Sequence, residues 1–311
     1  MLDHTSLESL LGYALALLLA PLLAGLILRV KAWAGGRKGS PLLIHYFTLA
    51  KLLRKGSVYS TSTTRMFKLG PVVSLATVLL ALAFVPLAGA APLLSFEGDV
   101  VLVLYLLGLG RFFTIAAALD TGSPFEGMGA AREATFPIIC EAALFMILIL
   151  FHRLTGGLSL GAFLAPSQAA SMWGAAGPSL LFAVLALFIV LLTESSRVPV
   201  DDPSTHLELT MIHEVMILDH SGPDLAAIEF GASLKLFFYA ALIAQLVHAL
   251  AAPSIAAGSA LFVGVLVLIY LAIGVSESVI ARYRMDRVPK FVLTSFALAA
   301  FALVLTLEAG S

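Results

Sequence analysis

The stretch Asp99–Leu119, DVVLVLYLLGLGRFFTIAAAL, decides the class of fold. After the aspartate at its start, its one charged residue is Arg111. A helix needs about 20 predominantly apolar residues to cross the hydrocarbon core of a bilayer. A helix also satisfies its own backbone hydrogen bonds, which the bilayer interior cannot do. The stretch therefore predicts a membrane-spanning helix that carries a cation within the membrane.

The composition of the whole chain agrees with this prediction. Of its 311 residues, 60% are hydrophobic and 12% are charged, and the mean hydropathy is +1.02. Soluble domains are about one-quarter charged. We therefore predict an all-α polytopic membrane protein with a single transmembrane domain over residues 1–311 and no soluble domain. The net charge of -1 gives no general electrostatic attraction to nucleic acid.

Hydropathy predicts eight spans. The segment 154–177 is too broken by Gly and Pro to be counted as another. The N-terminal segment starts with the acids Asp3 and Glu8 and lacks the basic start of a signal peptide, so we expect the first span to be a retained helix. The predicted spans lie at about 7–29, 71–90, 99–119, 134–152, 178–194, 233–251, 259–280 and 290–308.

The distribution of basic residues predicts the orientation. The loop 29–70 holds nine Lys and Arg residues and the loop 281–290 holds four, whereas the loops 91–98 and 252–258 hold none. Arg132 and Arg197 are expected in the two remaining loops on the basic side, and Arg153 is the one basic residue expected opposite. Basic loops stay in the cytoplasm, so we expect cytoplasmic main loops and both termini outside.

The first of these inner loops contains a predicted surface helix. In PLLIHYFTLAKLLRK, Pro41–Lys55, apolar residues recur at helical spacing and basic residues decorate the opposite side. Such a helix lies at the membrane surface. Two interpretations stay open, an anchor for lipid headgroups and part of a docking floor for a partner protein.

The most polar stretch is TESSRVPVDDPSTHLELTMIHEVMILDHSG, Thr193–Gly222, with six acids and three histidines. Asp202-Pro203 resembles a helix start and Ser221-Gly222-Pro223 a helix end, so we predict an amphipathic helix between them. A solvated loop is the plain alternative. A metal site is disfavoured, because His206 and His213 are two turns apart, beyond the spacing of a helical zinc motif.

Ionisable residues also lie inside or at the ends of the predicted spans. Glu141 and Arg111 are the deepest, whereas Glu194, Lys235 and Glu277 are near span ends, where ordinary interface charges are an alternative. A charge within the membrane is costly and usually pairs or lines a wet cavity. We predict a proton route lined by Glu133, Glu141, Glu194, Asp201, Glu208, Glu214 and Glu277. The predicted charge partners are Arg111, Arg132, Arg197, Lys235 and Arg282.

Four stretches in order resemble one family. ESSRVPVDDPSTHLEL resembles the acidic inner loop of subunit 1 of respiratory NADH dehydrogenase (complex I) and of the related membrane subunits of energy-converting hydrogenases, with Val200 in place of a usual Phe. The run Arg111–Phe136 is similar to the formate hydrogenlyase and hydrogenase-4 branch. GRKGSPLLIHYFTLAKLLRK and SESVIARYRM also match, the former including the expected docking residues Arg37, Tyr46 and Lys51.

The resemblance implies a membrane-arm subunit of an oxidoreductase complex in a prokaryotic plasma membrane, without a redox centre of its own. In this family the partners are soluble large and small subunits on the inner face, which carry iron–sulfur clusters and in some members a nickel–iron site, and antiporter-like membrane subunits. The translocated ion is a proton or sodium. The single cysteine, Cys140, cannot by itself hold an iron–sulfur cluster, a zinc ion or a disulfide.

Two alternatives stay open. One is a quinone-site-forming subunit of a complex I-type enzyme. Ser40, Ile44 and Thr48 stand where relatives often have Pro, Gln and Asp, which fits the hydrogenase side better. The other is a stand-alone secondary transporter, which would usually show paired broken helices in two repeated halves. The sequence has no such repeat.

Overall fold

The eight predicted spans are confirmed. The computed structural model describes residues 4–202, 211–248 and 255–309, and within them it is helical with no strand. Eight helices are long and apolar enough to cross a membrane. They are α1 (His4–Ala34), α3 (Arg65–Leu82), α4 (Asp99–Asp120), α5 (Pro124–Thr155), α7 (Pro166–Glu194), α9 (Gly222–His248), α10 (Ile255–Val279) and α11 (Val288–Ala309).

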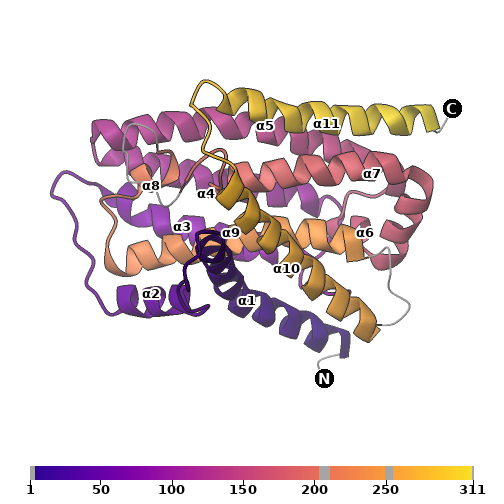
Figure 1. The fold of residues 1–311 in the computed structure, drawn as a ribbon, viewed down its shortest axis with the longest axis horizontal. Coiled ribbons are helices and arrows are strands. Elements are labelled where there is room, and N and C mark those ends of the chain that lie inside the picture. The colour runs from indigo at the N-terminus through magenta and orange to yellow at the C-terminus, as the bar shows by residue number, and fades with distance from the viewer. Residues whose placement is uncertain (1–3, 203–210, 249–254, 310–311) are drawn as a thin grey trace.

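Three short helices mark the two ends of the bundle. α2 (Ile44–Leu53) and α8 (His213–Met216) lie at one end, and α6 (Leu160–Phe163) lies at the other (Figure 1). We call these the α8 end and the α6 end. Both labelled chain ends lie toward the α6 end. The helix predicted within residues 41–55 is present as α2, which packs on α1 and α9.

Small residues set how closely the helices approach. Gly110 of α4 lies against Thr77 of α3, and Gly274 of α10 lies against Val30 of α1, where an added Cβ would collide in each case. Helices in membranes associate through such close contacts, because lipid is as apolar as the side chains. α9 is the central helix, with 72% of its most apolar window buried against at most 50% for the other spans.

Several predicted span boundaries differ from the ends of the helices, among them the starts of α7 at Pro166 and α9 at Gly222. Two of the differences have local reasons. The second span was expected at 71–90, but α3 ends at Leu82, and the chain turns through Pro86 and the left-handed Ala88. The fourth span was expected at 134–152, with Arg132 in a loop. α5 instead begins at Pro124, because proline suits the first helical turn, and Arg132 is helical.

The predicted helix from Asp202 to Ser221 is wrong in its described part. Met211 and Ile212 are not helical, and α8 is one turn long. Gly222 and Pro223 begin α9 rather than end a helix, which is the usual preference of proline. The Asp201 carboxylate accepts the amides of Ile212 and His213, which fixes a turn there. The predicted helix start at Pro203, with His206 and Glu208, lies outside the described residues.

Candidate functional site

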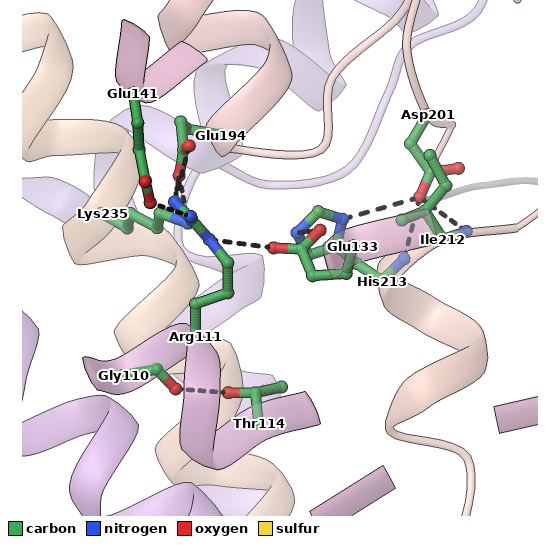
Figure 2. A network of polar contacts seen from close by, with 10 residues as sticks. All are labelled: Gly110, Arg111, Thr114, Glu133, Glu141, Glu194, Asp201, Ile212, His213 and Lys235. Atoms are coloured by element: carbon green, nitrogen blue, oxygen red, sulfur yellow. Dashed lines mark hydrogen bonds and ion pairs between the residues drawn. The ribbon is translucent and has the colours of Figure 1, made fainter. Parts of the chain in front are cut away.

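Arg111 is the centre of a buried ion-pair network. Its guanidinium donates to Glu141 of α5 at 2.5 Å and to both carboxylate oxygens of Glu194 of α7 at 2.7 and 2.9 Å (Figure 2). Its Nε lies 3.6 Å from Glu133 Oε1. The planar fork of arginine suits several carboxylates at once, so one cation joins α4, α5 and α7.

A second cation supports the most buried carboxylate of this network. Lys235 Nζ of α9 lies 2.9 Å from Glu194 Oε2, and the Glu194 side chain has no exposed surface. Glu194 is the last residue of α7, so its carboxylate lies at the negative end of a helix dipole. The two cations Arg111 and Lys235 therefore offset the cost of burying this carboxylate away from solvent.

His213 extends the network to the loop at the α8 end. Its Nε2 lies 3.1 Å from Glu133 Oε2, and its Nδ1 lies 3.9 Å from Asp201 Oδ2. Figure 2 shows the imidazole between these two carboxylates, with Arg111 on the far side of Glu133. A continuous series of ionisable groups therefore runs from Asp201 to Glu141.

Asp201 is held by several donors. Its Oδ1 lies 3.0 Å from Arg282 Nη2, and its Oδ2 accepts the amides of Ile212 and His213 at 3.1 Å each. Burial raises the pKa of Asp201, but hydrogen bonds and charge from His213 and the charge of Arg282 outweigh it, so the pKa is lowered overall. Asp201 therefore stays ionised and positions the loop.

Glu277 forms a second cluster between α1, α10 and the loop that follows α7. Lys31 Nζ lies 3.0 Å from one carboxylate oxygen and Arg197 Nη1 lies 3.5 Å from the other. The Glu277 side chain has no exposed surface. This cluster and the Arg111 network border the same cavity.

The cavity has a volume of about 370 Å³ and a mixed lining. Acids and bases of both clusters face it, together with apolar side chains such as Leu107 and Val78. A polar cavity of this size is large enough to hold water. The charged residues that line it are Lys31, Arg111, Glu133, Glu194, Arg197, His213, Glu214, Glu229, Lys235 and Glu277.

Glu141 differs from the other carboxylates of the network in its exposure. Its side chain is 43% exposed, against 5% or less for Glu133 and Glu194. Its neighbours on α5, Ile138 and Phe145, are exposed apolar residues. Glu141 therefore lies at the edge of the bundle, with Arg111 on its inner side.

The remaining predicted residues lie apart from the Arg111 network or at its edge. Arg132 donates to the carbonyl of Met211 at 2.7 Å and so holds the loop to α5. Glu214 lines the cavity. Arg37 and Lys51 are exposed, and the Tyr46 hydroxyl donates to the carbonyl of Leu18 on α1. Within the described residues, no group of three or more His, Cys, Asp or Glu is placed to hold a metal ion.

The chain matches a known protein family over nearly its whole length. Residues 8–307 match the family described as NADH dehydrogenase. The chain belongs to this family. It is 29% identical to hydrogenase-4 component C of Escherichia coli over 93% of this chain and 91% of that protein. It is 28% identical to formate hydrogenlyase subunit 4 of Escherichia coli over 93% of this chain and 95% of that protein.

Two further proteins resemble this chain less closely. A subunit of the NADH-quinone oxidoreductase of Rickettsia canadensis is 27% identical over 53% of this chain and 48% of that protein. A chain in the structure of the membrane-bound sulfane sulfur reductase, an archaeal respiratory membrane complex, superposes with a TM-score of 0.81. The match covers 97% of this chain and 99% of that chain at 21% identity, so this likeness shows the fold alone. The resemblance read from the sequence is confirmed.

Two members of the site were missed from the sequence. His213 was assigned to the polar face of a loop helix, and Lys31 was counted only as a basic loop residue. Glu133 is 80 residues from His213 and Glu277 is 246 residues from Lys31, although Asp201, the other partner of His213, is only 12 residues away. The signal that marked His213 was weak: a histidine followed by an acid in a loop already rich in both.

The charge of His213 predicts a pH dependence of stability. Burial lowers the pKa of His213, but Glu133 and Asp201 outweigh burial and raise the pKa from 6.5 to about 9. The raised pKa means that these ion pairs stabilise the fold fully below pH 6.5 and are lost as the pH rises through about 9. We expect the thermal midpoint in detergent to fall across this window, and to fall less in His213→Gln. Equal slopes would show that His213 is uncharged.

Proposed function

We propose that this protein is the membrane-arm subunit of a hydrogenase-type respiratory complex that couples electron transfer in a soluble module to proton translocation. The observation that carries the proposal is the continuous network from Asp201, in the loop at the α8 end, to Glu141 inside the membrane. Buried carboxylates beside a polar cavity are the groups that relay protons through a membrane. The α8 end then faces the cytoplasm and both termini lie outside.

The α8 end supplies the docking surface in this proposal. The first loop carries exposed basic side chains, among them Arg37 and Lys51. Its helix α2 lies at the same end of the bundle as α8 (Figure 1). The soluble large and small subunits bind at this surface and carry the iron–sulfur clusters and any nickel–iron site. Their redox steps act on the Asp201–His213 loop, and Glu208 and Glu214 of the same loop belong to the entry of the route.

The exposure of Glu141 supports a membrane partner. A carboxylate that is 43% exposed among apolar side chains would face hydrocarbon in an isolated subunit, at a cost of a few kcal/mol or more. An antiporter-like subunit that packs on this part of α4 and α5 removes this cost. It also receives the proton from Glu141.

Two linked measurements test the function. The first is affinity purification of the tagged protein in mild detergent, with co-purifying subunits identified by mass spectrometry. We expect a large subunit, an iron–sulfur subunit and antiporter-like membrane subunits. The second is acidification of inverted membrane vesicles driven by reduced methyl viologen and reported by a pH-sensitive dye. A protein that purifies alone, or vesicles that transfer electrons without moving protons, contradict the proposal.

The same purification distinguishes the quinone alternative. The match to a subunit of an NADH-quinone oxidoreductase supports it over about half of the chain. A large subunit with two Cys-x-x-Cys pairs favours a hydrogenase, because such thiolates bind nickel and iron. A large subunit without them, together with quinone-dependent electron transfer, favours the quinone-reducing type.

A further inference from the structure

His213 occupies the one-turn helix α8, pressed against the start of α5. Gly129 of α5 makes room for this turn, since a Cβ there would collide with Val215 and with the Ile212 carbonyl. Arg132 fixes a nearby residue of the loop by donating to the carbonyl of Met211. The histidine is thus placed by the backbone on both sides, with one ring nitrogen toward Glu133 and the other toward Asp201.

With the proton on His213, the positive and negative side chains of the ion-pair network are equal in number. With His213 protonated, the ion pairs of the network join four cations to four carboxylates: Arg111, Lys235, His213 and Arg282 to Glu133, Glu141, Glu194 and Asp201. The cations other than His213 are Lys and Arg, which keep their protons near neutral pH. A change in this set at neutral pH therefore takes place at the imidazole or at a carboxylate.

We propose that His213 is the proton relay between the cavity at the α8 end and Glu133, the first buried carboxylate of the route. This inference rests on the function proposed above and assigns its entry step to a residue of the loop. A lysine or arginine would serve at this position if only a permanent positive charge were needed. Imidazole acts as a proton shuttle in proteins, and the Nε2 that releases and regains the proton here faces Glu133, while Nδ1 faces Asp201.

Protons and charge balance in this transfer. The imidazolium gives its Nε2 proton to Glu133 Oε2, which leaves a neutral ring and a neutral carboxyl group. A hydronium ion that enters the cavity from the α8 end then reprotonates Nε2 and leaves as water. Glu133 passes its proton toward Glu141 through water beside Arg111, which keeps its own protons. Asp201 stays ionised throughout, because Arg282 and two backbone amides hold it, and Lys235 adds a nearby positive charge that favours release.

In this structure, the carboxylates around His213 hold its proton on the ring. A transfer that is driven by electron transfer must not occur without that energy. The pKa of His213 is raised to about 9 by Glu133 and Asp201 against burial, so the proton remains on the ring near neutral pH. The energy that moves the proton from the ring to Glu133 comes from the docked redox module.

The test uses the whole complex in inverted vesicles, with protons moved per electron as the readout. His213→Lys keeps a cation between Glu133 and Asp201 but replaces the imidazole with an ammonium group, which holds its proton more tightly. We expect it to assemble and to lower the proton yield at least about tenfold.

His213→Ala leaves space beside the cavity, and added imidazole is expected to restore part of its yield. Wild-type yield should fall above about pH 9, where the ring loses its proton.

His220→Ala is the matched control, because His220 is in the same loop but is stacked on Phe67 at 4.0 Å, away from Glu133. Imidazole should not change its yield. A His213→Lys complex that pumps like the wild type overturns the relay, as does an assembled His213→Ala complex that gains nothing from imidazole. If neither variant assembles, a wild-type yield that is flat through pH 9 overturns it. A wild type that moves no protons overturns the proposed function itself.

Discussion

Replacement of Arg111 by leucine is expected to prevent stable insertion or assembly of this protein. Arg111 is the shared partner of Glu133, Glu141 and Glu194, and Glu194 has no exposed side-chain surface. Removal of one partner of a buried ion pair costs about 3–5 kcal/mol, because it leaves a buried charge uncompensated. Here one substitution affects three carboxylates on two other helices.

The measurement is the amount of protein in membranes by immunoblot, followed by its thermal midpoint in detergent. Arg111→Lys should be intermediate, because one ammonium nitrogen replaces the two guanidinium nitrogens that donate separately to Glu141 and to Glu194. Adding Glu194→Gln to Arg111→Leu should recover part of the loss. Arg287→Leu, at an exposed loop position, is the control. Wild-type abundance and midpoint in Arg111→Leu would contradict the central role of this residue.

Replacement of Glu141 by glutamine is expected to abolish proton transport while assembly persists. Glutamine has the same shape and its carbonyl can still accept from Arg111, so the packing of α4 on α5 is retained. It cannot bind and release a proton. We therefore expect at least a roughly tenfold fall in protons moved per electron, with the same subunits co-purifying.

Glu8→Gln is the control for this variant, because Glu8 is exposed at the start of α1 and has no place in the proposed route. Its vesicles should acidify like those of the wild type. Unchanged pumping in Glu141→Gln would remove Glu141 from the route and would leave its exposed carboxylate as a contact with a neighbouring subunit. Loss of the neighbouring subunit from Glu141→Gln would instead make its charge part of that interface.

The sequence by itself determined which segments cross the membrane. Hydropathy placed all eight spans and the surface helix α2, because the cost of burying backbone and charge in lipid is a property of each segment alone. The same reasoning identified Arg111 and Glu141 as charges within the membrane. The order of motifs indicated the family, now confirmed over residues 8–307.

Only the tertiary structure decided which charges meet. Arg111 and Glu194 are 83 residues apart, and Lys31 and Glu277 are 246 apart, so no local pattern relates them. The one-turn α8 was also beyond the sequence, since the Asp201 side chain and the Arg132 guanidinium take backbone groups of the loop that a longer helix would need. Ion pairs depend on how whole helices pack, and that packing is set by close contacts such as Gly110 on Thr77. Hydropathy predicts whether a segment lies within the membrane. The ion-pair partner of a charged residue depends on which helices pack around it.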